Sequence, residues 1–169
     1  MEQILDLRFV ATEDNVIFCG PHGVGKSTFL RAIAHAAVHR GMTVITVSAQ
    51  SLFTDLESID SPSRLKSALR RLSTIELLCI DELGYLEYND RAADLFYAVV
   101  NARYEAKRPL VISTNLRFRQ WGKVFKSAAC TGAIIERLIH RSRVITIEGR
   151  SWRLREAELR DSAALDASG

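Results

Sequence analysis

The sequence predicts an α/β fold in which a five-stranded parallel sheet is sandwiched between helices. Short apolar runs alternate with longer segments whose apolar residues recur at helical spacing, and this alternation is typical of βαβ units. The chain has 169 residues, of which 47% are hydrophobic and 25% are charged, as expected of one globular domain. We expect this domain to cover residues 1–160 and residues 161–169, which are small and polar, to form a disordered tail.

Five apolar runs, rich in Val, Ile or Leu, are the predicted strands. Runs this short without alternating polar residues are expected of strands that are buried on both faces of a sheet. They cover residues 16–19, 43–47, 77–80, 110–113 and 144–147. We expect residues 152–158 to extend the edge of the last strand as a short hairpin arm.

The segments between these strands are the predicted helices. They cover residues 26–40, 50–59, 63–72, 90–106 and 129–141. Gly41 supplies a stop for the first helix. In the last helix the apolar spacing places four side chains inward, those of Ile134, Ile135, Leu138 and Ile139.

The composition excludes several classes of protein. No apolar run approaches the roughly 20 residues that a membrane helix needs, and the N-terminus carries acidic residues where a secretory signal needs a basic start. The three cysteines are an odd number, and Cys19 and Cys79 lie inside apolar runs, which favours buried, reduced thiols. We therefore expect a cytoplasmic protein with no membrane contact.

Residues 20–27 read Gly-Pro-His-Gly-Val-Gly-Lys-Ser and match the pattern G-x-x-x-x-G-K-[ST]. Glycines let the backbone curl so that its N–H groups surround an anion, and the following helix N-terminus adds positive partial charge. Lys26 can reach the β- and γ-phosphates, and the Ser27 hydroxyl can bind Mg²⁺. The pattern lies between a predicted strand and a predicted helix, so it predicts an ATP or GTP site with Mg²⁺. The predicted nucleotide-binding residues are Gly20, Pro21, His22, Gly23, Val24, Gly25, Lys26, Ser27 and Thr28.

Two adjacent carboxylates, Asp81 and Glu82, follow the third predicted strand. The carboxyl ends of parallel strands form the edge of the sheet at which ligands bind. There Asp81 can hold Mg²⁺ through its water shell, and Glu82 can accept a proton from an attacking water. This pair favours hydrolysis over transfer to a small substrate, although an acidic pair can also be an ordinary solvated strand exit.

Asn115 follows the fourth predicted strand and is expected at the same edge. Its amide can hydrogen-bond both the γ-phosphate and the attacking water. The alternative role is local, because asparagine also caps turns.

Arg137 and Arg141 lie four residues apart on the last predicted helix, opposite its apolar face. A P-loop ATPase can receive a cationic group from a neighbouring subunit, an arginine finger that is worth on the order of 10³–10⁵ in rate. We expect Arg137 to be that finger, with Arg141 as the alternative and a solvated surface charge as the simpler explanation.

The net charge of +3 is unevenly distributed. Residues 103–143 contain ten Lys or Arg against two acids, and the predicted helix over residues 63–72 carries Arg64, Lys66, Arg70 and Arg71 around an apolar side. Basic residues grouped in this way can follow a phosphate backbone. They are also typical of an amphipathic surface helix whose long side chains cover the core.

The chain resembles the IstB-like family of AAA+ ATPases, helper proteins of insertion-sequence transposition that are related to the DnaC helicase loaders. The resemblance covers residues 7–156 and is carried by the segments GPHGVGKS, LLCIDELGYL, LFYAVVNARYE, VISTNLRFRQWGKVF, IIERLIHRSRVITIEG and SWRLRE. It implies a P-loop NTPase core with a Walker A motif at residues 20–27, a Walker B motif at Asp81-Glu82, a sensor-1 Asn115 and an interprotomer Arg137. It also implies self-association into ATP-dependent oligomers on duplex DNA that recruit or regulate a transposase.

The sequence departs from the family pattern in two places. His22 replaces the proline of the family's GPPGVGK. Family members also carry an N-terminal region ahead of the core, whereas this chain starts almost at the core and ends soon after the fifth predicted strand, so we expect no separate lid domain.

Four functions remain open from the sequence. The leading one is an Mg²⁺-dependent ATPase of the transposition-helper type. The others are a DnaC-like helicase loader, an ATP-gated DNA-binding scaffold with little hydrolysis, and an N-terminally truncated core that is inactive alone.

Overall fold

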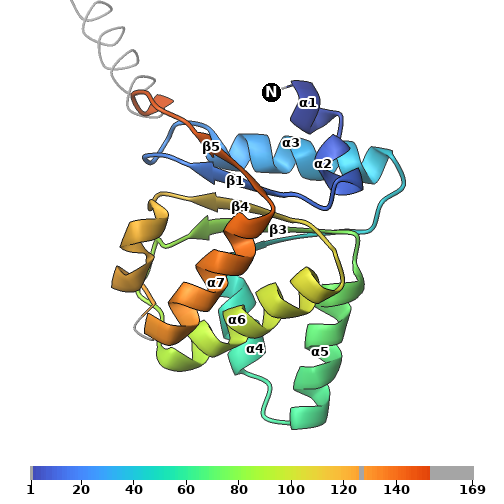
Figure 1. Ribbon diagram of the computed structural model, residues 1–169, viewed down its shortest axis with the longest axis vertical. Helices are drawn as coiled ribbons and strands as arrows, with labels where there is room; N and C mark the ends of the chain where they lie inside the picture. Colours follow the sequence, from blue (N-terminus) through green and yellow to red (C-terminus); the bar gives the residue numbers. More distant parts are fainter. Residues whose placement is uncertain (1, 126–127, 153–169) are drawn as a thin grey trace, which may run out of the picture.

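The computed structural model describes residues 2–125 and 128–152, and a five-stranded sheet forms its centre (Figure 1). The strands are β1 (Asn15–Cys19), β2 (Val44–Ser48), β3 (Leu77–Leu83), β4 (Leu110–Thr114) and β5 (Ser142–Thr146). All neighbouring strands are parallel. The predicted α/β fold is confirmed.

The strand order is β2-β3-β4-β1-β5. Because β1 lies between β4 and β5, and β3 lies next to β4, the carboxyl ends of β1, β4 and β3 are consecutive along one edge. The connections after β1 and after β4 leave on opposite sides of the sheet, and ligands of open α/β sheets bind outside such a switch point. The fold thus brings the ends of the three motif-bearing strands together.

Two of the strand predictions need correction at their ends. β3 continues to Leu83, past the predicted end at residue 80, because residues 81–83 still lie alongside β4. β5 covers Ser142–Thr146 and starts two residues earlier than predicted, since Asn15 and Ser142 pair at the first position of β1.

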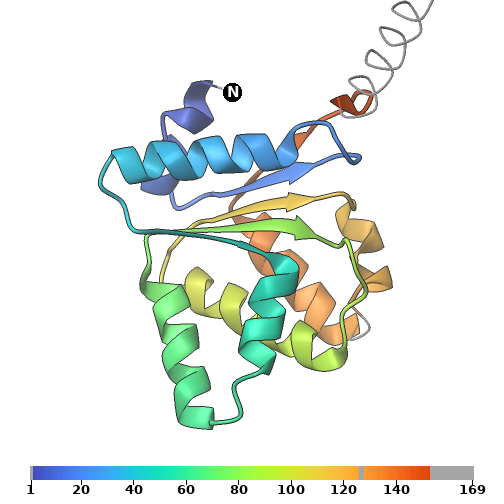
Figure 2. The same cartoon turned by 180° about the vertical axis from the view of Figure 1, so that it is seen from behind.

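Three helices cover one face of the sheet: α1 (Glu2–Leu5), α2 (Arg8–Ala11) and α3 (Lys26–His39) (Figure 2). The two short N-terminal helices were not predicted. They have a packing role, because Phe9 of α2 is fully buried in the same cluster as Phe18 of β1 and Leu30 of α3.

Four helices and one 3₁₀ helix cover the other face (Figure 1). They are α4 (Ala49–Glu57), α5 (Pro62–Thr74), α6 (Asp90–Glu105), α7 (Ala128–His140) and the 3₁₀ helix η1 (Phe118–Lys123). Their core is aromatic: the Phe96 ring contacts the rings of Phe53, Trp121 and Phe125, and Trp121 also contacts Phe125. In α7, Ile134 and Leu138 are buried as predicted, but Ile139 is 45% exposed, so its predicted inward position is wrong.

Arg103 of α6 is a fully buried arginine at the amino edge of the sheet. Its guanidinium donates hydrogen bonds to four backbone carbonyls, those of Leu72, Ile75, Glu76 and Pro109. Burial lowers the pKa of this guanidinium to about 10, so the group is still protonated at neutral pH. It joins the end of α5 to the entries of β3 and β4.

In the part of the chain that the structure describes, no helix is long and apolar enough to cross a membrane. Cys19 and Cys79 are buried and free, as predicted. The predicted tail over residues 161–169 and most of the predicted arm over residues 152–158 lie outside the described residues.

Candidate nucleotide-binding site

Residues 20–27 form a loop between the carboxyl end of β1 and the first turn of α3. Gly23 and Gly25 have φ angles of 77° and 93°, in the left-handed region that glycine adopts at no steric cost. A Cβ at Gly20 would lie 2.2 Å from the carbonyl oxygen of Ile147. The loop therefore needs these glycines for its curl and for its close approach to the chain that follows β5.

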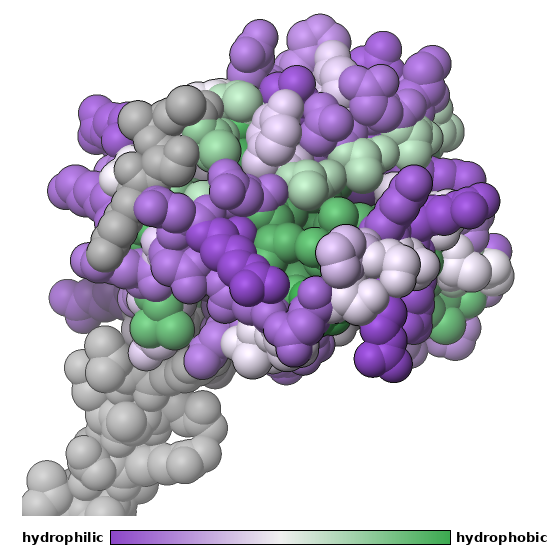
Figure 3. Space-filling model, turned by 90° about the horizontal axis from the view of Figure 1, so that it is seen from below, coloured by the Kyte–Doolittle hydropathy of each residue, from purple (hydrophilic) through white to green (hydrophobic). Residues whose placement is uncertain are grey.

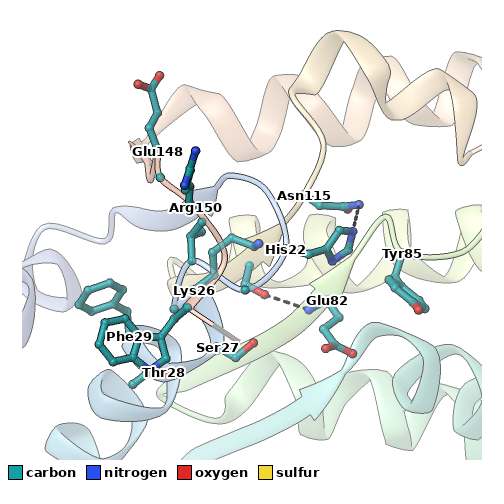
Figure 4. Close-up of a pocket in the computed structure, with 16 residues that line it drawn as sticks. His22, Lys26, Ser27, Thr28, Phe29, Glu82, Tyr85, Asn115, Glu148 and Arg150 are labelled. Atoms are coloured by element: carbon teal, nitrogen blue, oxygen red, sulfur yellow. Dashed lines mark hydrogen bonds between the residues drawn. The ribbon is translucent and has the colours of Figure 1, made fainter. Parts of the chain in front are cut away.

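Lys26 begins α3, and its side chain is buried along this loop. Its Nζ donates to the carbonyl oxygens of Gly20 at 2.8 Å and Pro21 at 2.6 Å. The ammonium group is thus held at the mouth of the loop, near the N-terminus of α3 (Figure 4).

Ser27 and Asp81 come from α3 and β3 and meet directly. The Ser27 hydroxyl donates to Asp81 Oδ1 at 3.0 Å, and the hydroxyl of the buried Ser113 donates to the same oxygen. A serine hydroxyl and a carboxylate are oxygen ligands of the kind that Mg²⁺ prefers. The predicted metal ligands Ser27 and Asp81 therefore fit the ion in chemistry and in position.

Glu82 lies on a β-bulge. Ile80 pairs with Ile112 and Leu83 pairs with Thr114, so Asp81 and Glu82 together face Ser113 alone. Glu82 has a φ of 60°, and its backbone N–H donates to Ser113 Oγ at 2.9 Å.

A bulge redirects side chains that would otherwise alternate between the two faces of the sheet. Here Asp81 is buried beside Ser27, while Glu82 is exposed and lines the cavity. A positive φ at a residue other than glycine costs on the order of 1 kcal/mol, and such strain is concentrated at functional sites. Ser113 was not among the predicted site residues; a serine in an otherwise apolar strand was the available signal.

Asn115 follows β4, and its Nδ2 lies 3.1 Å from His22 Nε2 of the phosphate loop. The His22 ring in turn meets Tyr85 edge to face, with ring centroids 5.7 Å apart. Figure 4 shows Asn115 above the His22 ring and Tyr85 to its right, with Glu82 below them. The structure thus brings Asn115 to the same edge as the other predicted residues.

A cavity of about 430 Å³ lies over the loop and is lined by Glu82, Ser113 and Asn115 together with residues 22–29. Its far wall is formed by Glu148, Gly149, Arg150 and Trp152, which sequence reasoning did not assign to the site. They are placed there because the backbone N–H of Trp152 donates to the carbonyl of Gly23 at 3.0 Å. No local sequence pattern predicts this contact between distant segments.

The thiol next to the loop has no catalytic character. Burial raises the pKa of the Cys19 thiol, so this group is protonated at neutral pH and is a poor nucleophile. The polar groups of the cavity, rather than the cysteine, provide its chemistry.

Arg137 and Arg141 lie away from this cavity. Arg137 is in the last turn of α7, where its Nε donates to Asn101 Oδ1 at 2.8 Å and its guanidinium lies 5.0 Å from the Tyr97 ring centroid. Arg141 pairs with Glu13. Both line a second cavity of about 200 Å³ at the amino edge of the sheet, so the structure does not bring them to the phosphate loop of the same chain.

The loop, the buried lysine and the serine–aspartate pair at the switch point define a P-loop nucleotide-binding domain. The chain belongs to the family described as IstB-like ATP binding protein, whose sequence model matches residues 1–160.

Relatives from insertion sequences have the same description. The chain is 35% identical over 158 residues to the IS232 putative ATP-binding protein of Bacillus thuringiensis subsp. berliner, covering 92% of this chain and 63% of the relative. It is 36% identical over 156 residues to the IS21 putative ATP-binding protein of Pseudomonas aeruginosa, covering 92% and 58%. The chain thus spans less than two thirds of the length of these curated relatives.

Solved structures share the fold at low sequence identity. The crystal structure of DnaI matches with a TM-score of 0.72 and 22% identity, over 88% of this chain and 80% of that one. The DnaC helicase loader matches with a TM-score of 0.68 and 19% identity, over 86% and 87%. The replication initiator DnaA bound to AMPPCP and single-stranded DNA matches with a TM-score of 0.72 and 17% identity, over 88% and 45%. These AAA+ proteins support the predicted fold class and nothing finer.

Proposed function

We propose that this chain is an Mg²⁺-dependent ATPase that assembles on DNA through ATP sites shared between subunits and recruits or regulates a transposase. The observation that carries the proposal is the bulge in β3, which places Asp81 against Ser27 and turns Glu82 into the cavity over the phosphate loop. A metal ligand and a general base side by side at a phosphate site favour hydrolysis over simple binding.

Each residue has a distinct task in this proposal. The loop N–H groups bind the phosphates, and Lys26 exchanges its contacts with the Gly20 and Pro21 carbonyls for phosphate oxygens. Ser27 and Asp81 hold Mg²⁺, which when bound neutralises charge on the phosphates. Glu82 accepts the proton of the attacking water, and the Asn115 amide orients that water.

The arginine that completes this site comes from a second subunit. Arg137 precedes β5 at the amino edge of the sheet, whereas the phosphate loop follows β1 at the carboxyl edge. A five-residue strand separates the two edges by roughly 15 Å, beyond the reach of a side chain held against Asn101. Stacking the carboxyl edge of one subunit on the amino edge of the next would bring Arg137 to ATP.

The DNA contact is proposed for α5. Its four cations Arg64, Lys66, Arg70 and Arg71 are all exposed, while Leu72 is buried in the core. Figure 3 shows the molecule from the end at which α4 and α5 project, and the surface there is mostly hydrophilic around a smaller hydrophobic patch. The relatives are named as ATP-binding proteins of insertion sequences, which are DNA elements, and this supports DNA as a partner.

The test of hydrolysis is Glu82→Gln. Removing the base should lower phosphate release by about 100-fold or more, while ATP binding is kept because the phosphate contacts are unchanged. Binding is measured with a fluorescent ATP analogue and turnover by phosphate release. The matched control is Glu87→Gln in the same loop, which does not line the cavity and should release phosphate at the wild-type rate.

Two results would contradict this assignment. Unchanged turnover in Glu82→Gln would exclude Glu82 as the base. An absence of phosphate release by the wild-type protein, both with and without duplex DNA, would favour the ATP-gated scaffold.

The DNA contact is tested with Lys66→Ala/Arg70→Ala. If both cations neutralise phosphates, the slope of log affinity against log salt for duplex DNA should become less steep by about 2. Arg31→Ala on α3, an exposed cation on the opposite face of the sheet, is the control and should leave the slope unchanged. Equal slopes for wild type and double variant would place the DNA elsewhere.

A further inference from the structure

His22 is an exposed residue of the phosphate loop whose side chain contacts Asn115 rather than the loop itself. The contact joins Asn115 Nδ2 to His22 Nε2 at 3.1 Å. An amide nitrogen can only donate, so in this contact His22 Nε2 is the acceptor. His22 therefore contacts the nitrogen of the Asn115 amide and not its oxygen.

The other end of this amide has its own neighbour. A Cβ built on Gly84 would lie 3.5 Å from Asn115 Oδ1, so the amide oxygen faces the loop that follows Glu82. The Asn115 nitrogen thus faces the phosphate loop, and its oxygen faces the segment that carries the carboxylate. In this orientation a second N–H is left to donate toward a phosphate, and the oxygen can accept from a water near Glu82.

The imidazole has a second neighbour besides Asn115. Tyr85 meets it edge to face at 5.7 Å with an interplanar angle of 83°. Gly84, which precedes Tyr85, is fixed by a hydrogen bond from its N–H to Tyr88 Oη at 3.1 Å, and Tyr88 is buried. The backbone next to Tyr85 is therefore anchored to the core, while the His22 and Tyr85 rings contact each other at the surface.

We propose that His22 is a positioning residue, which fixes the orientation of the Asn115 amide that ATP hydrolysis requires. This inference rests on the proposed ATPase function. It gives His22 a role through its side chain, in addition to the role that its backbone N–H has in the phosphate loop. If the side chain at this position has no acceptor, the Asn115 amide is free to rotate and exchange the places of its oxygen and nitrogen.

Two substitutions separate the acceptor from the ring. His22→Phe keeps a ring against Tyr85 and removes the acceptor, whereas His22→Gln supplies an oxygen acceptor at similar reach. Loss of one hydrogen bond that orients a reacting group should lower kcat about fivefold in His22→Phe. The KM for ATP should stay within about twofold, since the backbone holds the phosphates, and His22→Gln should restore kcat. Equal kcat for His22→Phe and wild type, or a kcat for His22→Gln as low as that for His22→Phe, would overturn the proposal.

A double-variant cycle tests whether His22 acts through Asn115. The fivefold loss should disappear when His22→Phe is made in an Asn115→Ala background, because the amide to be oriented is gone. If the two losses multiply instead, His22 acts by another route and the proposal fails.

A readout without nucleotide is given by the side-chain ¹⁵N–¹H signals of Asn115, assigned by their loss in Asn115→Ala. His22→Phe should shift the hydrogen-bonded proton of this pair upfield, and His22→Gln should not. Unshifted signals in His22→Phe would overturn the contact itself. A failure of the proposed ATPase function would be seen separately, as unchanged phosphate release in Glu82→Gln. The Asn115 signals do not depend on that result, so they test the His22 contact on its own.

Discussion

The amino and carboxyl edges of the central sheet contain the same residue types in different roles. At the amino edge, Asn15 is buried, its Nδ2 donates to the Leu138 carbonyl at 3.2 Å and its Oδ1 accepts from the Leu110 N–H at 2.9 Å. At the carboxyl edge, Asn115 faces an open cavity and contacts the side chain of His22. One amide joins backbone segments and the other lines a cavity.

Charged groups follow the same division. Arg103 at the amino edge donates to four backbone carbonyls, whereas Asp81 at the carboxyl edge accepts from the hydroxyl of Ser27, itself a candidate metal ligand. Hydrogen bonds from a buried side chain to backbone groups of separate segments stabilise the fold. Polar groups that bond one another around a cavity are available for chemistry. The partners of a residue, rather than its type, separate the two functions.

The largest expected effect is that of Arg137→Ala, and it would show that a residue at the amino edge also takes part in ATP hydrolysis. Arg137→Ala should lower ATP turnover by on the order of 10³ or more in the assembled protein, because it removes a cation from the neighbour's site. Mixing Arg137→Ala with Glu82→Gln should restore part of the activity, since a mixed pair contains one intact site. Phosphate release is measured as a function of protein concentration with DNA.

Arg141→Ala is the matched comparison, because Arg141 is the alternative finger and pairs with Glu13 at the surface; a loss of turnover in Arg141→Ala alone would assign the finger to Arg141. An equal loss in dilute monomer, or no restoration on mixing, would argue that Arg137 acts within its own chain.

A smaller effect is expected from Arg103→Met, which tests the structural side of the comparison. The substitution removes the donor from four backbone carbonyls, of which two are in buried hydrogen bonds and two in partly buried ones, and each buried group left unpaired costs about 1–3 kcal/mol. We expect the free energy of unfolding in urea to fall by about 3 kcal/mol or more, while the folded fraction still binds ATP. Arg108→Ala, an exposed neighbour, should change the stability little. Loss of ATP binding without loss of stability would give Arg103 a functional role.

The smallest effect concerns Glu76 at the entry of β3. Hydrogen bonds from the Thr43 backbone N–H at 2.7 Å and the Thr43 hydroxyl at 3.0 Å hold the pKa of the Glu76 carboxyl below its ordinary value of 4.5. Because the pKa is lower in the folded state, the carboxylate adds stability above about pH 4.5, and this contribution is lost as the pH falls through the folded pKa.

Glu76→Gln should therefore be less stable than wild type at pH 7, with a difference that shrinks on acidification. Urea unfolding at pH 7 and at pH 3.5 measures it. A difference that does not depend on pH would show that the Thr43 contacts do not perturb the carboxyl.

Much of the site could be predicted from sequence because its parts are local. The phosphate loop at residues 20–27 is a contiguous pattern, and Asp81-Glu82 and Asn115 each follow an apolar strand. All five predicted strands and all five predicted helices are present, within three residues at each end. The short helices α1 and α2 were missed, because four-residue helices have too few turns to show a periodicity.

The sequence by itself determined the class of this protein, since a strand, a glycine loop and a helix with Lys26-Ser27 are sufficient for a phosphate site. Only the tertiary structure decided how the side chains around that site are oriented and which of them are in contact. The bulge that turns Asp81 and Glu82 in different directions exists because β3 pairs with β4 around Ser113. The contact of His22 with Asn115 joins residues 93 positions apart. Both features depend on which segments become neighbours, and that is set by strand order and register, which no local pattern encodes.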